Sequence, residues 1–224
     1  MSISVAKAPE TKRASPWLII FDKILSRLAR FLVNFNNRLF KVVPGSKQHL
    51  KTKELILYVA NKLDSKHNYG GTLLNKALYF IDNVNYLRTG QPISIFKYVK
   101  QDFGPTPEPS QWMPIRQALL DSGEAIIKEH DYFGRVQKKL IATRDADISH
   151  FTSEEIDLIN EIILHIGDWS AVQVSDYTHK YLAWKAADNK ESLPFYTFLL
   201  SSKTPSEQDL EWAKAEVKRG LQGQ

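Results

Sequence analysis

Three neighbouring residues, Ser175, Asp176 and His179, have the types that nucleophilic hydrolysis requires. A serine nucleophile needs a histidine base, and that base needs a carboxylate on its other ring nitrogen. Ser175 and Asp176 stand four and three residues before His179, so a helix would place both on one side of the imidazole. Neighbours on one helical face cannot easily reach opposite ring nitrogens. We therefore expect His179 to form hydrogen bonds that brace a nearby loop and Trp184, and we expect no catalytic residue here.

Metal and phosphate sites have no clear signature either. The six histidines are scattered, cysteine is absent, and neither an HExxH motif nor a histidine pair at metal-ligand spacing occurs. Gly70-Gly71-Thr72 precedes a predicted helix and could offer backbone N–H groups to an anion, but Gly-Gly is more often a simple turn. The sequence thus predicts no metal and no cofactor. A hydrolase that uses His179 or Asp82 is the weakest functional hypothesis.

The helix predicted from Thr72 onward, with Thr72 as its cap, carries two different faces. Leu74, Leu78 and Ile81 form an apolar stripe at helical spacing, which is typical of a core-facing helix. A neighbouring face is polar and bulky, and its residues are Asn75, Tyr79, Asp82 and Tyr86. Such a face predicts either a buried, hydrogen-bonded seam or a surface for a ligand or partner.

The other elements follow from periodicity and capping residues. Helices are predicted over 50–64, from Ser110 to Asp121, from Thr152-Ser153-Glu154-Glu155 to Gly167, from Ser170 through Trp184, and after Thr204. A strand is predicted over 93–100, followed by a stiff corner at 103–107, and a hairpin over 124–130 and 135–143. The fold class is mainly α (α+β): a compact helical domain with a small antiparallel β-hairpin, preceded by a basic amphipathic helix.

That N-terminal helix, predicted over 16–43, lies in the part of the chain that carries all of the surplus positive charge. The chain has 30 basic and 25 acidic residues, and the first 50 positions hold nine and two of them, which leaves 21 and 23 for the remainder. Its apolar stripe must be covered by the protein's own body, by a groove on a partner, or by a membrane surface. As candidate partner contacts we select Trp17, Phe21, Arg27, Arg30, Phe31 and Phe35.

Residues 72–107 and a later segment follow the pattern of one family. Their shared features are a Leu-Asn-Lys helix with a Tyr-Phe pair, a Gly-x-Pro-Ile turn, a Gly-Pro loop, and a Thr-His followed by Trp and a Pro-aromatic pair. The matching residues are Leu74, Asn75, Lys76, Tyr79, Phe80, Asp82, Tyr86, Gly90, Pro92, Ile93, Tyr98, Gly104, Pro105, Thr178, His179, Trp184, Pro194 and Phe195. Over roughly residues 50 to 200 the chain resembles the Panacea domain, the SocA-like antitoxin domain.

The resemblance implies an antitoxin that binds and silences a toxin protein encoded by an adjacent gene. It also implies a division into a basic extension (1–47), the Panacea domain (48–202) and a C-terminal helix packing on it (203–224). The alternative is a DNA-binding autorepressor that uses the basic N-terminal segment, since several phosphate contacts would give salt-dependent binding. The absence of cysteine fits a reducing cytoplasm, where we expect the protein to act.

Overall fold

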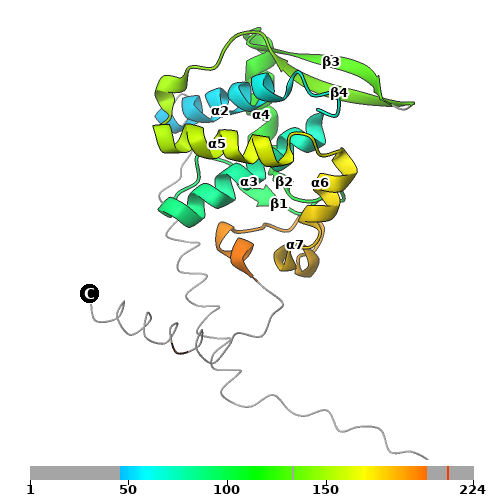
Figure 1. Ribbon diagram of the computed structural model, residues 1–224. Helices are drawn as coiled ribbons and strands as arrows, with labels where there is room; N and C mark the ends of the chain where they lie inside the picture. The colour runs from blue at the N-terminus through cyan, green and yellow to red at the C-terminus, as the bar shows by residue number, and fades with distance from the viewer. Residues whose placement is uncertain (1–45, 133, 201–210, 212–224) are drawn as a thin grey trace, which may run out of the picture. The chain divides into compact units, whose positions relative to one another are not determined.

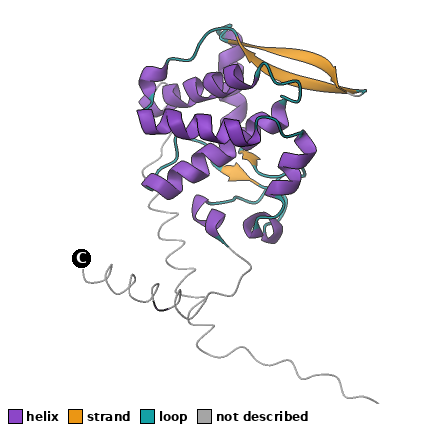
Figure 2. Ribbon diagram, viewed as in Figure 1, coloured by secondary structure: helices purple, strands orange, loops and turns teal. Residues whose placement is uncertain are grey.

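The computed structural model describes residues 46–132, 134–200 and 211. Within these residues it shows a mainly α fold with two small antiparallel sheets, as the sequence predicted (Figures 1 and 2). The helix predicted over 16–43 and most of the one predicted after Thr204 lie outside the described residues. No helix of the described part is long and apolar enough to cross a membrane.

Three helices, α2 (Lys47–Leu63), α3 (Gly71–Thr89) and α5 (Ser153–Ile166), pack together to form most of the core. Leu55 and Val59 of α2, Leu74 and Leu78 of α3, and Ile159 of α5 are all at most 1% exposed. Each such side chain stabilises the fold by about 1.5–3 kcal/mol relative to an exposed position. The predicted apolar stripes therefore hold α3 in a fixed orientation.

Two predicted helix starts were wrong. The helix predicted from residue 50 begins at Lys47, because Ser46 is its N-cap and accepts a hydrogen bond from the His49 N–H at 3.2 Å. The N-cap of α3 is Gly70, not Thr72. Gly70 has extended backbone and its carbonyl accepts from the Leu74 N–H at 3.1 Å, so Thr72 already lies within the first turn.

The strand predicted over 93–100 is mostly irregular. Only β1 (Tyr98–Val99) is a strand, and it pairs antiparallel with β2 (Thr106–Pro107). The Ser94 N–H donates to the Asp82 side chain at 2.8 Å, and the Phe96 N–H donates to the Ser94 hydroxyl at 3.0 Å. Because side chains satisfy these backbone groups, the segment needs no partner strand.

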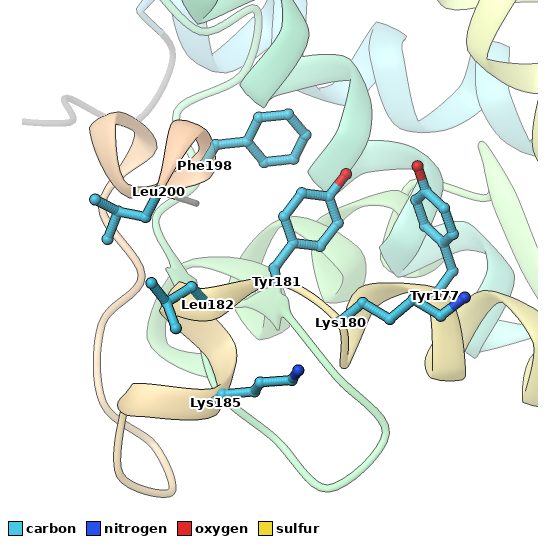
Figure 3. A pocket seen from close by; sticks show the side chains of 7 residues that line it. All are labelled: Tyr177, Lys180, Tyr181, Leu182, Lys185, Phe198 and Leu200. Carbon is cyan, nitrogen blue, oxygen red and sulfur yellow. The ribbon is translucent and has the colours of Figure 1, made fainter. Parts of the chain in front are cut away.

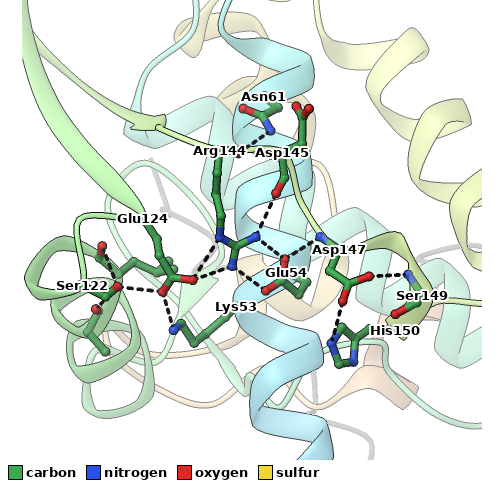
Figure 4. Close-up of polar contacts among 12 residues, drawn as sticks. Lys53, Glu54, Asn61, Ser122, Glu124, Arg144, Asp145, Asp147, Ser149 and His150 are labelled. Carbon is green, nitrogen blue, oxygen red and sulfur yellow. Dashed lines mark hydrogen bonds and ion pairs between the residues drawn. The ribbon is translucent and has the colours of Figure 1, made fainter.

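The predicted hairpin is confirmed as β3 (Ala125–Tyr132) and β4 (Arg135–Ala142), and Figure 1 shows it extending beyond the helices. Its register runs from Ala125 opposite Ala142 to Tyr132 opposite Arg135. The helix before it, α4 (Pro109–Asp121), ends at Asp121 as predicted, and its N-cap is Glu108, two residues before Ser110. At the hairpin base, Arg144 bridges Glu54 of α2 and Glu124 (Figure 4).

The last third confirms one predicted helix and divides another. Thr152 and Glu155 form the predicted capping box, and α5 ends at Ile166, just before Gly167. The helix predicted from Ser170 through Trp184 is two helices, α6 (Ala171–Thr178) and α7 (Leu182–Ala186), followed by η2 (Phe195–Leu199). The break at 179–181 lets the Tyr181 ring stack on Phe198 at 4.8 Å between centroids.

Candidate partner-binding surface

Asp82 is the centre of the polar seam on α3. It is fully buried and accepts hydrogen bonds from the Ser94 N–H at 2.8 Å, from the Ser94 hydroxyl, and from the Tyr98 hydroxyl at 2.6 Å. Burial raises the pKa of Asp82, whereas the hydrogen bonds from Ser94 and Tyr98 oppose that rise. The strand β1 and the segment before it are thus anchored to α3 through one carboxyl group.

The aromatic residues of the same α3 face pack against later parts of the chain. Tyr79 is 2% exposed and makes edge contacts with Tyr98 at 5.2 Å and Phe198 at 5.9 Å. Tyr86 stacks on Phe195 at 5.2 Å. Asn75 is only partly buried, and its side-chain oxygen has no hydrogen-bond partner among the described residues. This face is therefore mainly the buried seam that one of the two interpretations predicted.

Lys76 is buried beneath the Gly-Pro loop. Its Nζ donates to the Pro105 carbonyl at 2.7 Å, and burial lowers the pKa of Lys76 to about 7. Gly104 has φ +96°, and a Cβ there would overlap the Thr178 hydroxyl and lie 2.9 Å from Cε of Lys76. The Leu-Asn-Lys and Gly-Pro motifs thus meet the Thr-His motif at a single point.

His179 contacts Trp184, as the sequence predicted, but by ring stacking and not, among the described residues, through the expected side-chain hydrogen bonds. Its ring stacks on Trp184 at 3.9 Å, and Nζ of Lys100 lies 4.4 Å from the centroid of the Trp184 ring. Burial lowers the pKa of His179, and the charges of Lys76 and Lys100 lower it further. Within the described part of the chain, no hydrogen bond joins the His179 ring to Ser175 or Asp176, and its Nε2 has no partner.

Three further motif residues shape the backbone. Gly90 is the C-cap of α3 with φ +77°, and its N–H donates to the Tyr86 carbonyl at 2.8 Å. Pro92 follows it in the turn, and Pro194 is the N-cap of η2.

The candidate contacts Trp17, Phe21, Arg27, Arg30, Phe31 and Phe35 all lie outside the described residues. Nowhere in the described ranges do three or more His, Asp or Glu residues gather as a possible metal site.

Beside the motif residues lies a cavity of about 350 Å³ that the sequence did not reveal. We call it the aromatic groove, and its lining residues are Tyr177, Lys180, Tyr181, Leu182, Lys185, Phe198 and Leu200 (Figure 3). Tyr177 is 41% exposed and Leu200 is 50% exposed. The sequence predicted one continuous helix through Tyr177 and Tyr181, whereas the groove forms only because the chain turns between α6 and α7.

The groove is connected to the family helix by ring contacts. Phe80 of α3 lies 5.9 Å from Tyr177, 6.4 Å from Tyr181 and 6.5 Å from Phe198, measured between ring centroids. Phe80 itself is 5% exposed. The Tyr79-Phe80 pair of the motif thus packs against the aromatic rings that line the groove.

Comparisons with known proteins identify a family over the same region. The model of the antitoxin SocA-like, Panacea domain family matches residues 74–185, which is half of the 224-residue chain. The match runs from Leu74 of α3 to Lys185 of α7, so it includes both Tyr79-Phe80 and His179. No curated protein and no solved structure matches the chain significantly.

Proposed function

Since this chain belongs to the family of SocA-like antitoxins that carry the Panacea domain, we propose that it neutralises a toxin protein by binding it directly. The family match over residues 74–185 is the observation that carries the proposal. The matched motifs hold buried scaffold residues, and the aromatic groove lies next to them. Such a rigid scaffold beside an open apolar site suits recognition of a protein surface.

We also propose that neutralisation needs no catalytic turnover and no cofactor. His179, the best candidate for a base, is stacked on Trp184, and no serine or carboxylate bonds to its ring in the described part of the chain. Asp82, the other candidate, does not face an open site, because it is fully buried and accepts hydrogen bonds from Ser94 and Tyr98. Binding alone would then silence the toxin.

Growth of cells that express the adjacent reading frame tests this function. The neighbouring protein should stop growth when expressed alone, and expression of this chain should restore growth. The two proteins should then co-purify as a stable complex. A harmless neighbour, or rescue without any complex, would contradict direct neutralisation.

We propose that the N-terminal segment contributes contacts to the same toxin. Its candidate residues lie on one predicted helix, and four are aromatic and two are basic: Trp17, Phe21, Arg27, Arg30, Phe31 and Phe35. Deleting residues 1–45 keeps Ser46, the cap of α2, and so leaves the described domain intact. If the variant that lacks residues 1–45 binds the toxin as tightly as the full chain, this contribution is refuted.

A further inference from the structure

The aromatic groove exposes large side chains that are held rigidly. Tyr181 stacks on Phe198 at 4.8 Å with a 25° angle between the rings, and Tyr177 makes edge contacts with Trp169 at 5.2 Å and Tyr181 at 5.9 Å. Rigid aromatic rings lose little conformational entropy on binding, which is why they are frequent at the centres of protein interfaces. The floor of the groove is therefore suited to an apolar anchor of a partner.

The rim of the groove is positively charged. Lys180 and Lys185 are both exposed, and no salt bridge within the described residues joins either of them to a carboxylate. Nζ of Lys180 lies 5.8 Å from the centroid of the Tyr177 ring, and Figure 3 shows Lys185 farther from the rings, below Leu182. Cations on the rim of an apolar site favour acidic partners and disfavour basic ones.

The volume limits what the groove can hold. Its cavity of about 350 Å³ lies near the lower end of the range of roughly 300–1,000 Å³ that binding pockets span. That space suits about one or two large apolar side chains, not a whole helix. The remaining contacts of a partner would lie on the rim, beside Lys180 and Lys185.

We propose that the aromatic groove binds an apolar segment of the toxin that is flanked by acidic side chains. This inference rests on the proposed function and specifies the surface that performs it. One or two apolar side chains of the toxin pack against Tyr181, Phe198 and Leu200, and its carboxylates pair with Lys180 and Lys185. The protein's own first 45 residues are a poor occupant, since they carry eight basic and only two acidic side chains.

Paired variants of the full chain test the charge and the apolar anchor separately. Lys180→Glu combined with Lys185→Glu should weaken toxin binding roughly 10–100-fold, because like charges would face each other across the rim. Its control is Lys62→Glu with Lys128→Glu, which reverses two exposed lysines outside both the groove and the basic N-terminal segment. Leu200→Asp should weaken binding roughly tenfold or more. Its control is Leu164→Asp, at an 80% exposed leucine of α5.

Binding is measured by titrating the purified product of the adjacent reading frame, and also overlapping peptides that span its sequence. Peptides with apolar residues between carboxylates should bind the full chain and should lose affinity in the Lys180/Lys185 variant. Acid-to-lysine changes in the best peptide should restore its affinity for that variant. Such a rescue would not follow from a general loss of structure.

The outcomes separate the two proposals. If the unmodified chain neither protects cells nor binds the neighbouring protein, the proposed function fails and this inference with it. If the unmodified chain protects and binds, but the groove variants bind as tightly as their controls, only the groove assignment is overturned. It is also overturned if the variants leave toxin binding unchanged and instead make residues 203–224 more sensitive to protease, since the occupant would then be the protein's own C-terminal segment.

Discussion

At the scale of single residues, Lys76 links stability to pH. Burial lowers its pKa to about 7 in the folded protein, whereas an unfolded chain holds it near the usual value of about 10.4. Below pH 7 both states carry the proton, so this group adds no pH dependence. Between about pH 7 and 10.4 only the unfolded state stays protonated, so the free energy of unfolding rises with pH, by at most about 1.4 kcal/mol per unit.

Lys76→Met keeps the aliphatic stem and removes the amine, so we expect it to lose this rise. Urea unfolding of both proteins at pH 7, 8 and 9 measures the difference, and other titrating groups cancel in the comparison. The chain has no cysteine, so thiol oxidation does not complicate the alkaline measurements. If the free energies of unfolding of the two proteins change in the same way across this range, the pKa of Lys76 is not lowered.

Gly104 is a residue at which both backbone and space exclude a side chain. Gly104→Ala should destabilise the domain by about 2–4 kcal/mol, because φ +96° strains an L-residue and the added Cβ would overlap the Thr178 hydroxyl. Gly90→Ala is the matched control. It has φ +77° but nothing within 4 Å of a built Cβ, so it should cost only about 1–2 kcal/mol. Equal losses, measured by denaturant unfolding, would show that the close contact with Thr178 has no effect.

At the scale of elements, one arginine fixes the hairpin to α2. Arg144 donates to both oxygens of Glu54 at 2.7 and 2.9 Å and also to Glu124, and the Glu54 side chain is only 9% exposed (Figure 4). Arg144→Met would leave Glu54 without its cation, whereas Glu124 would keep its ion pair with Lys53, so we expect a loss of about 2–4 kcal/mol. Lys138→Met breaks an ion pair with Glu129 in which both side chains are more than half exposed, and should cost about 0.5 kcal/mol or less.

The same network predicts a loss of stability in acid. Burial opposes ionisation of Glu124, but hydrogen bonds from Lys53, Ser122 and Arg144 outweigh it and lower the pKa of Glu124 to about 2. A carboxylate with a lowered pKa stabilises the fold above its ordinary value near 4.5, and this stabilisation is lost as the pH falls toward 2. Arg144→Met should therefore show a shallower decline over this window in acid-unfolding curves. If stability declines equally steeply in both proteins, other carboxylates cause most of the loss of stability in acid.

Local hydrogen bonding decided which elements could be predicted from the sequence. The capping box at Thr152 and the hairpin around Gly134 are complete within a few residues of chain, and both are confirmed. The strand over 93–100 was wrong because Asp82, twelve residues earlier, binds the Ser94 backbone. The continuous helix from Ser170 was wrong because Phe80 and Phe198 hold the Tyr181 ring. The aromatic groove depends on those same distant contacts, so helical spacing alone could not reveal it.

At the scale of the whole molecule, charge is divided between two parts of the chain. Residues 1–50 hold nine basic and two acidic side chains, while the remaining 174 residues are almost neutral. Charges distant from an interface core mainly change the rate of association, and buried apolar anchors mainly change the rate of dissociation. The basic segment and the aromatic groove should therefore leave different kinetic signatures on toxin binding.

Association and dissociation rates of the toxin complex, measured by surface plasmon resonance at several salt concentrations, can separate them. Deleting residues 1–45 should slow association by roughly tenfold at low salt and flatten its salt dependence, because an acidic partner is no longer attracted over a distance of about one Debye length. Leu200→Asp should instead speed dissociation and keep the salt dependence of the full chain. If the deletion speeds dissociation as much as Leu200→Asp does, the N-terminal contacts anchor the toxin as strongly as the groove does, and attraction by charge is not their main effect.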